Sequence, residues 1–320
     1  MTINQLIKLY EDLYEDYVEQ FIHEIFPLNK FTEPVYYYLE REKIKFRSGV
    51  PILINQMFKG KVENVIPVSA ASEIIYAITL AQDDIIDGDE IRWGLPTSWK
   101  KYGAGMTLAS ADYSYYFVIK ILKRIPNSLL NKRKIIDSFI DSHKKLYLSV
   151  MMEINNKKNF KIDIKDVLKI YEFKTMTGIN ATYCGALSVD GLPNKIYKII
   201  RNYARWLAYS AQIRDDIKDI EVYNTKSSDI INGYMTYPIV KLKSSLNYSD
   251  FEIFKSNFGV NSDDAVDRIL SLLKKYNVKS QCVKDINNFV YKAFSEVDKI
   301  KKLGYDNVEI LKVWATFYKM

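Results

Sequence analysis

The chain has 320 residues, of which 48% are hydrophobic and 27% charged, and its 46 Lys and Arg against 39 Asp and Glu give a formal net charge of +7. This balance excludes a disordered chain, and 12 Gly with 8 Pro are too few for a collagen-like or low-complexity protein. The two cysteines, Cys184 and Cys282, stand far apart without a CxxC pair, so neither a disulfide framework nor a zinc site is expected.

The first twenty residues carry acidic side chains at short intervals and lack the apolar stretch of a signal peptide. No uncharged apolar run approaches the roughly 18 residues of a membrane-spanning helix. The positive charge is scattered, and a small cluster such as 131–134 is typical of a solvated helix face rather than of a nucleic-acid-binding patch. The sequence therefore predicts a cytoplasmic protein with no transmembrane segment and no nucleic-acid partner.

Apolar residues recur at the spacing of amphipathic helices along most of the chain, and alternating strand patterns are absent over most of its length. Gly and Pro interrupt the pattern near residues 27, 49–51, 60–67, 88–96, 126, 191–193 and 233–238. One helix is predicted to begin after Asp163, which forms an N-cap signal with Asp166, and a longer one to run from about Lys195 to Glu221. With no repeat or linker visible, we expect a single all-α domain over 1–320, a large bundle of roughly ten helices.

Two acidic motifs of the form D-D-x-x-D stand at the C-terminal ends of two predicted helices. The first consists of Asp83, Asp84 and Asp87, and the second of Asp215, Asp216 and Asp219. An acidic run usually marks a solvated helix face, which should lie opposite the apolar stripe. Here Leu80 continues directly into Asp83 and Asp87 on one stripe, and Ala208 and Gln212 continue into Asp215 in the same way. We therefore expect these carboxylates to point inward.

Inward carboxylates at the C-terminal end of a helix oppose the helix dipole and are costly unless a cation neutralises them. All-carboxylate sites suit magnesium or calcium, and the two histidines, His23 and His143, lie outside both motifs, which disfavours zinc. Magnesium prefers one or two carboxylates together with substrate phosphates. Two facing carboxylate sets at the mouth of an apolar cavity therefore predict a ligand with a polyanionic head and an apolar tail, which describes a prenyl diphosphate.

From about Glu42 to Lys243 the sequence resembles the trans-prenyl diphosphate synthase, or polyprenyl synthetase, family. The matching segments read AQDDIIDGDEIRWGLPT, KYG, KTMTG, QIRDDIKD and DIINGYMTYP. The resemblance implies an all-helical isoprenoid-synthase fold with a central cavity, usually in a homodimer. It also implies the ionisation of an allylic prenyl diphosphate whose diphosphate is bridged by two or three Mg²⁺ ions.

The resemblance assigns roles to individual residues. The implied metal ligands are Asp83, Asp87 and Asp215, supported by Asp84, Asp216 and Asp219. The implied contacts to the allylic diphosphate are Arg92, Lys174, Thr175 and Gln212. Lys174 acts with the metal-binding aspartates in catalysis, because positive charge around the departing diphosphate lets the C–O bond break to an allylic cation.

The half of the implied site that would bind isopentenyl diphosphate departs from the family pattern. Arg47 is kept, but other positions have lost their basic residue, namely Ile44 (lysine in the family), Tyr76 (histidine), Trp93 (arginine) and Tyr234 (a lysine that also touches the allylic half). Lys43 or Lys45 is a candidate to replace the missing lysine. Losing three contacts of about 1.5–3 kcal/mol each would weaken isopentenyl diphosphate binding by several kcal/mol, and three aromatics at such positions predict a remodelled pocket.

Three hypotheses stay open at this point. The protein is a chain-elongating prenyltransferase that condenses the allylic cation with isopentenyl diphosphate at an altered second site. Alternatively, it is a terpene synthase or cyclase on the same scaffold, in which the cation reacts with its own double bonds or with water. A third hypothesis is a non-catalytic partner subunit, which would have no need of the two intact aspartate motifs.

Overall fold

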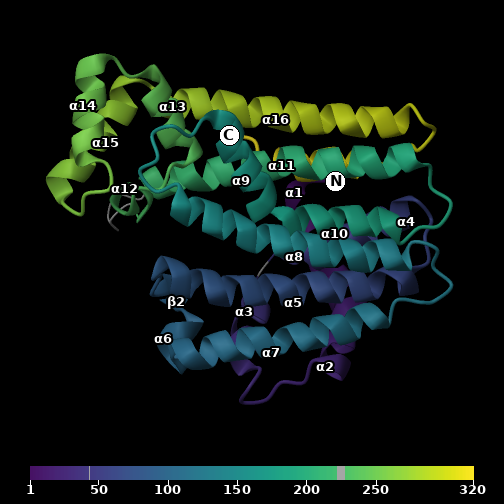
Figure 1. The fold of residues 1–320 in the computed structure, drawn as a ribbon. Helices are drawn as coiled ribbons and strands as arrows, with labels where there is room; N and C mark the ends of the chain where they lie inside the picture. The colour runs from purple at the N-terminus through teal and green to yellow at the C-terminus, as the bar shows by residue number, and fades with distance from the viewer. Residues whose placement is uncertain (43, 222–227) are drawn as a thin grey trace. The chain divides into compact units, whose positions relative to one another are not determined.

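The computed structural model describes residues 1–42, 44–221 and 228–320, so Lys43, one candidate for the missing lysine, lies outside the described residues. The chain divides into two compact units, which are described separately. Unit 1 comprises Met1–Ile140 and Thr177–Arg201, and unit 2 comprises Asp141–Met176 and Asn202–Met320. In the described ranges both units are helical, with one short β-hairpin in unit 1 (Figure 1).

Unit 1 is organised around one long helix, α5, which packs against α3, α4 and α7 (Figure 1). The elements that lie wholly in unit 1 are α1 (Ile3–Tyr14), the π-helical turn η1 (Glu15–Glu19), α2 (Gln20–Ile25), α3 (Glu33–Leu39), α4 (Phe46–Met57), α5 (Val62–Asp87), β1 (Ile91–Arg92), β2 (Leu95–Pro96), α6 (Ser98–Tyr102) and α7 (Ala104–Lys123). By length and composition α5 could cross a membrane, but 83% of its most apolar 18-residue stretch is buried in the protein. We identify it as a buried core helix.

Unit 2 has its own core, in which α13 packs against α9, α15 and α16. Its helices are α9 (Ile164–Lys174), α12 (Ser228–Asn232), α13 (Tyr237–Ser245), α14 (Tyr248–Asn257), α15 (Asp263–Lys275), α16 (Val278–Lys301) and α17 (Glu309–Thr316). Three further helices contribute residues to both units, namely α8 (Lys132–Asn155), α10 (Met176–Leu187) and α11 (Asn194–Glu221). The centre of this core is aromatic, since the rings of Phe254 and Phe258 stack with centroids 5.0 Å apart.

The predicted all-α class is confirmed. Asp163 accepts hydrogen bonds from the N–H groups of Lys165 and Asp166, and Asp166 accepts one from the N–H of Asp163, so α9 begins where the sequence indicated. The helices are more numerous than the rough expectation, because short breaks divide periodic segments; one such break at Thr175 separates α9 from α10. The single domain over 1–320 stays a prediction.

Candidate active site

The first aspartate motif occupies the last turns of α5, and the chain reverses immediately after it. Gly88 adopts a left-handed φ of 74° and donates its N–H to the carbonyl of Asp84, a conformation that glycine reaches without steric cost. Ile91 and Arg92 then pair with Pro96 and Leu95 in the β1–β2 hairpin. The hairpin returns Arg92 to the aspartates of α5.

Asp84 is the best-buried side chain of the first motif and is fully engaged by protein donors. Its Oδ1 accepts from Arg92, with Nε at 2.7 Å and Nη2 at 2.5 Å, and its Oδ2 accepts from the hydroxyl of Tyr38. Burial alone would lower the pKa of Arg92, but the hydrogen bond and charge of Asp84 raise it, so the guanidinium stays charged. Asp83 is half-buried and Asp87 is exposed.

This order of burial differs from the stripe argument, which expected Asp83 and Asp87 to point inward. The reason is that α5 is buried on nearly all sides, so its apolar residues do not single out one inner face. Asp84 therefore becomes the inward carboxylate, while the two outer aspartates of the motif remain accessible to solvent.

The second motif shows the same division in unit 2. The middle residue, Asp216, accepts from the hydroxyl of Tyr171 and from the N–H of Tyr237 at 3.3 Å. Burial and the nearby negative charge of Asp229 raise its pKa well above the usual value. Asp215, by contrast, has a side chain that is 57% exposed and lies 3.7 Å from Lys218. Each motif thus holds its middle aspartate with a tyrosine and leaves an outer aspartate exposed; Asp219 is half-buried.

Lys174 lies at the C-terminal end of α9, close to this second motif. Its Nζ donates to Oε1 of Glu153 at 3.2 Å. Although burial raises the pKa of Asp216, the positive charge of Lys174 acts against that rise. Thr175, which ends α9, donates its hydroxyl to the carbonyl of Tyr171 at 2.7 Å. These three predicted residues, Lys174, Thr175 and Asp216, are therefore brought together.

Gln212 is half-buried and lies one turn before Asp216 on α11. Tyr234 lines a cavity of about 20 Å³ with neighbours that include Glu153, Tyr171 and Thr236. The ammonium of Lys157 lies 4.3 Å from the centroid of the Tyr234 ring, within cation–π distance.

Sequence reasoning missed three neighbours of the motifs, namely Tyr38, Tyr171 and Glu153, and one neighbour of Tyr234, Lys157. The two tyrosines read as ordinary core residues in the sequence. Glu153 and Lys157 are four residues apart and lie outside every recognised segment, so the i, i+4 spacing was their only signal.

In unit 1, Arg47 is stacked between two aromatic rings. Its guanidinium carbon lies 3.2 Å from the centroid of Tyr76 and 4.2 Å from that of Phe46. Within the described part of the chain, its Nε is buried and has no hydrogen-bond partner. Burial raises the pKa of Tyr76 to about 12, so its hydroxyl is neutral. Glu42 is close by, since the charge of Arg47 opposes the rise in the Glu42 pKa that burial causes.

The candidate replacement Lys45 and the changed position Trp93 differ from each other in exposure. Lys45 is only 8% exposed, donates to the carbonyl of Leu39 at 2.6 Å and lies 4.5 Å from the Tyr14 ring. A contact between Lys45 and a substrate would require it to leave these partners. Trp93 is 47% exposed and adopts a left-handed φ of 53° in the hairpin turn, a conformation that is uncommon for a bulky residue. Such strain is typical of functional positions.

Known proteins resemble this chain over most of its length. The polyprenyl synthetase family model matches residues 29–276. A short chain isoprenyl diphosphate synthase of Methanothermobacter thermautotrophicus is 23% identical over 282 residues, 86% of each protein. Geranylgeranyl pyrophosphate synthetase of Pyrococcus horikoshii has a similar structure, with a TM-score of 0.83, 20% identity and coverage of 97% of this chain and 98% of that one.

A polyprenyl synthase of Caulobacter crescentus, solved in complex with calcium and isoprenyl diphosphate, has a TM-score of 0.85 at 15% identity and covers 99% of this chain and 97% of its own. These structural likenesses confirm the predicted isoprenoid-synthase type of fold. The family match covers well over half of the sequence. The chain therefore belongs to the polyprenyl synthetase family, and the predicted enzyme class, a prenyltransferase of the trans-prenyl diphosphate synthase type, is confirmed.

Proposed function

We propose that the protein ionises an allylic prenyl diphosphate in the presence of Mg²⁺ and transfers the prenyl group to isopentenyl diphosphate at a weakened second site. The observation that carries this proposal is the common organisation of the two motifs. In each, a tyrosine holds the middle aspartate, Asp84 or Asp216, while Asp83 and Asp87 or Asp215 stay accessible for a ligand. The calcium and isoprenyl diphosphate bound to the Caulobacter protein support the same ligand class.

The available donors fit magnesium that is shared with a substrate. Asp83 and Asp87 lie one helical turn apart on α5, and Asp215 and Asp219 are spaced equally on α11. Within the described ranges, no three His, Cys, Asp or Glu side chains form a metal-binding group. Mg²⁺ prefers one or two carboxylate ligands, with substrate phosphate oxygens filling other positions of its coordination shell. We assign these four residues to metal binding and Asp84 and Asp216 to the support of their neighbours.

When bound, Mg²⁺ supplies Lewis-acid charge to the diphosphate leaving group. Arg92 and Lys174 add fixed positive charge that offsets the negative charge developing on the diphosphate as the C–O bond breaks. Asp84 positions the Arg92 guanidinium, and Glu153 positions the Lys174 ammonium. We further propose that Thr175, Gln212 and Tyr234 contact the diphosphate, and that the rings of Tyr76 and Trp93 offer π faces to the allylic cation.

The weakened second site is proposed on the surroundings of Arg47. This arginine would be the main cation for isopentenyl diphosphate, yet the Tyr76 ring covers its face. Lys45 is committed to Leu39, so it does not replace the basic residue lost at Ile44. This arrangement is also compatible with the terpene synthase hypothesis. Aromatic rings would stabilise an allylic cation that reacts without isopentenyl diphosphate.

One assay decides between these functions. The purified protein is incubated with ten-, fifteen- and twenty-carbon allylic diphosphates, each with and without isopentenyl diphosphate. We expect consumption of isopentenyl diphosphate, a longer prenyl diphosphate, and loss of turnover in EDTA that excess Mg²⁺ reverses. Diphosphate release with a hydrocarbon or alcohol product and no isopentenyl diphosphate consumption would instead assign a terpene synthase, and no turnover under any condition would favour a partner subunit.

We also propose that the protein is a cytoplasmic homodimer that associates through α7. This helix exposes large apolar side chains to solvent in unit 1, namely Met106, Leu108, Tyr113, Tyr116 and Ile119. Because such a patch is unusual for a monomer, it marks an interaction surface. Sedimentation velocity should give a dimer for the wild type and a shift to monomer for the Tyr116→Lys/Ile119→Lys variant, whereas a monomeric wild type at micromolar concentration contradicts the proposal.

A further inference from the structure

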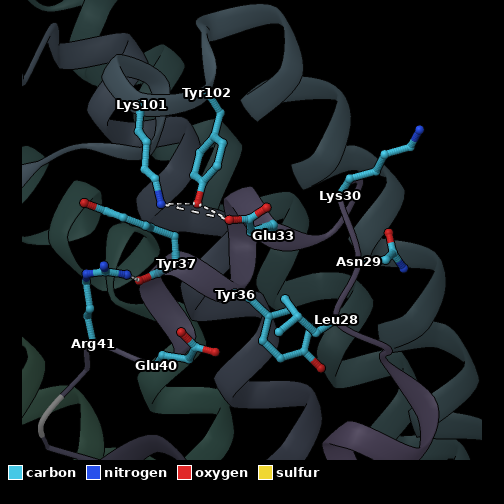
Figure 2. Close-up of a pocket in the computed structure, with 10 residues that line it drawn as sticks. All are labelled: Leu28, Asn29, Lys30, Glu33, Tyr36, Tyr37, Glu40, Arg41, Lys101 and Tyr102. Carbon is cyan, nitrogen blue, oxygen red and sulfur yellow. Dashed lines mark hydrogen bonds and ion pairs between the residues drawn. The ribbon is translucent and has the colours of Figure 1, made fainter.

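A pocket of about 320 Å³ lies on the outer face of α3 in unit 1, and none of its lining residues belongs to either aspartate motif (Figure 2). Its lining comes from the segment before α3, from one face of α3 and from the end of α6: Leu28, Asn29, Lys30, Glu33, Tyr36, Tyr37, Glu40, Arg41, Lys101 and Tyr102. The volume is at the lower end of the range of about 300–1,000 Å³ found for small-molecule sites. The pocket is therefore large enough for a small metabolite.

Two cations converge on one aromatic ring of this pocket. The guanidinium carbon of Arg41 lies 3.6 Å from the centroid of Tyr37, and the ammonium of Lys101 lies 5.1 Å from the same centroid. The charge of Arg41 acts on Lys101. The hydrogen bond that Lys101 donates to Tyr102 raises the pKa of Lys101, and the positive charge of Arg41 opposes that rise. Two cationic side chains at the same ring give this part of the pocket a positive potential, which favours an anion.

Arg41 has most of its donors free for such an anion. Its Nη1 donates to the carbonyl of Tyr37 at 2.9 Å (Figure 2). Among the residues that the structure describes, no carboxylate forms a salt bridge with Arg41. Stacking on the Tyr37 ring fixes the plane of the guanidinium, and a fixed planar fork suits phosphate oxygens.

The two carboxylates of the pocket, Glu33 and Glu40, differ in whether they form hydrogen bonds and ion pairs. Glu33 accepts from the Tyr102 hydroxyl at 2.9 Å and lies 3.9 Å from Lys101, as the dashed lines in Figure 2 mark. The side chain of Glu40 has neither a hydrogen bond nor an ion pair within the described part of the chain. A free carboxylate beside an anion site disfavours a second anionic group and favours hydroxyl donors.

We propose that this pocket binds a small phosphorylated polyol, with its phosphate at Arg41 and Lys101 and its hydroxyls donating to Glu40. The nearly buried rings of Tyr36 and Tyr37 form an aromatic floor for the carbon skeleton. A phosphate with several hydroxyls on a short carbon chain satisfies the two cations and the free carboxylate together.

The pocket is linked to the first aspartate motif through two consecutive residues of α3. The hydroxyl of Tyr37 donates to the carbonyl of Pro96 at 2.5 Å in the hairpin that carries Arg92, and the hydroxyl of Tyr38 donates to Asp84. A ligand that alters the Tyr37 ring therefore acts on the hairpin, and through it on the affinity for the allylic diphosphate. This coupling rests on the proposed function, whereas binding of the polyol does not.

Isothermal titration of the full chain tests the binding, with ribose 5-phosphate as the probe and ribose and inorganic phosphate as separate arms. Ribose 5-phosphate should bind more tightly than either arm. Arg41→Gln and Lys101→Gln should each weaken its binding about tenfold to a hundredfold, the usual effect of one charge-assisted contact. The matched control is Lys100→Gln, because Lys100 pairs with Glu90 at 2.9 Å and does not line the pocket; its binding should equal that of the wild type.

Absence of ribose 5-phosphate binding overturns the proposal, as does an Arg41→Gln variant that binds as tightly as the wild type. Equal binding of inorganic phosphate overturns the role of Glu40.

The coupling is tested separately. Saturating ribose 5-phosphate should change the affinity for an allylic diphosphate, since linkage is reciprocal. Tyr37→Phe should abolish this change while the variant still binds ribose 5-phosphate. An unchanged allylic affinity in the wild type overturns the coupling.

Discussion

Asp83→Asn and Asp215→Asn should each lower kcat for allylic diphosphate ionisation by about a thousandfold or more, because each removes a proposed charged metal ligand and with it the electrostatic stabilisation of the leaving group. Both side chains are accessible, so neither substitution leaves a buried charge without its partner. Release of diphosphate from a radiolabelled allylic substrate measures the effect, and circular dichroism checks that both variants remain helical.

Matched controls make this result specific to the motifs. Asp137→Asn on α8 and Asp264→Asn on α15 remove aspartates that pair with Arg133 and Arg268 and are more exposed than Asp83 and Asp215, and both variants should keep wild-type turnover. Near-normal kcat in Asp83→Asn or in Asp215→Asn would remove that aspartate from the metal site. An equal loss in the controls would point to a general effect of charge.

The triple variant Ile44→Lys/Tyr76→His/Trp93→Arg should bind isopentenyl diphosphate at least a thousandfold more tightly than the wild type, since each restored contact contributes about 1.5–3 kcal/mol. Replacing the Tyr76 phenol by a smaller imidazole also uncovers part of Arg47, whose guanidinium carbon now lies 3.2 Å from the Tyr76 ring centroid. The KM for isopentenyl diphosphate and its dissociation constant measure the gain.

Tyr76→Phe is the control for this experiment, because it keeps the ring over Arg47 while it removes only the hydroxyl. It should leave the affinity for isopentenyl diphosphate close to that of the wild type. A wild-type protein that already binds as tightly as the triple variant would show that the second site is intact despite its changed residues.

Local signals in the sequence were sufficient to predict the all-α class, two of the helices and the position of both motifs on helices. Asp163 and Asp166 located the start of α9, and the apolar period located α11 to within one residue of its first position. The N-cap of α9 and the apolar period of α11 depend on contacts between residues three or four positions apart, so they can be read from the local sequence.

Contacts between distant elements were not predictable in the same way. The hydrogen bond from Tyr38 to Asp84 joins residues 46 positions apart, and nothing in either local pattern distinguishes that tyrosine from core. The same is true of Tyr171 and Asp216. Lys45 was a candidate for substrate contact because it neighbours Ile44, where the family has a lysine, but its ammonium donates to the carbonyl of Leu39 inside the protein.

The tyrosine that holds each middle aspartate has a consequence for the order in which ligands arrive. With Asp84 and Asp216 satisfied internally, each motif presents at most two carboxylates, too few to retain a strongly hydrated Mg²⁺ ion by themselves. The ion would therefore enter together with the diphosphate, and its apparent affinity would rise with substrate concentration. Free magnesium in the cell would then set how much of the enzyme is loaded, without any dedicated sensor.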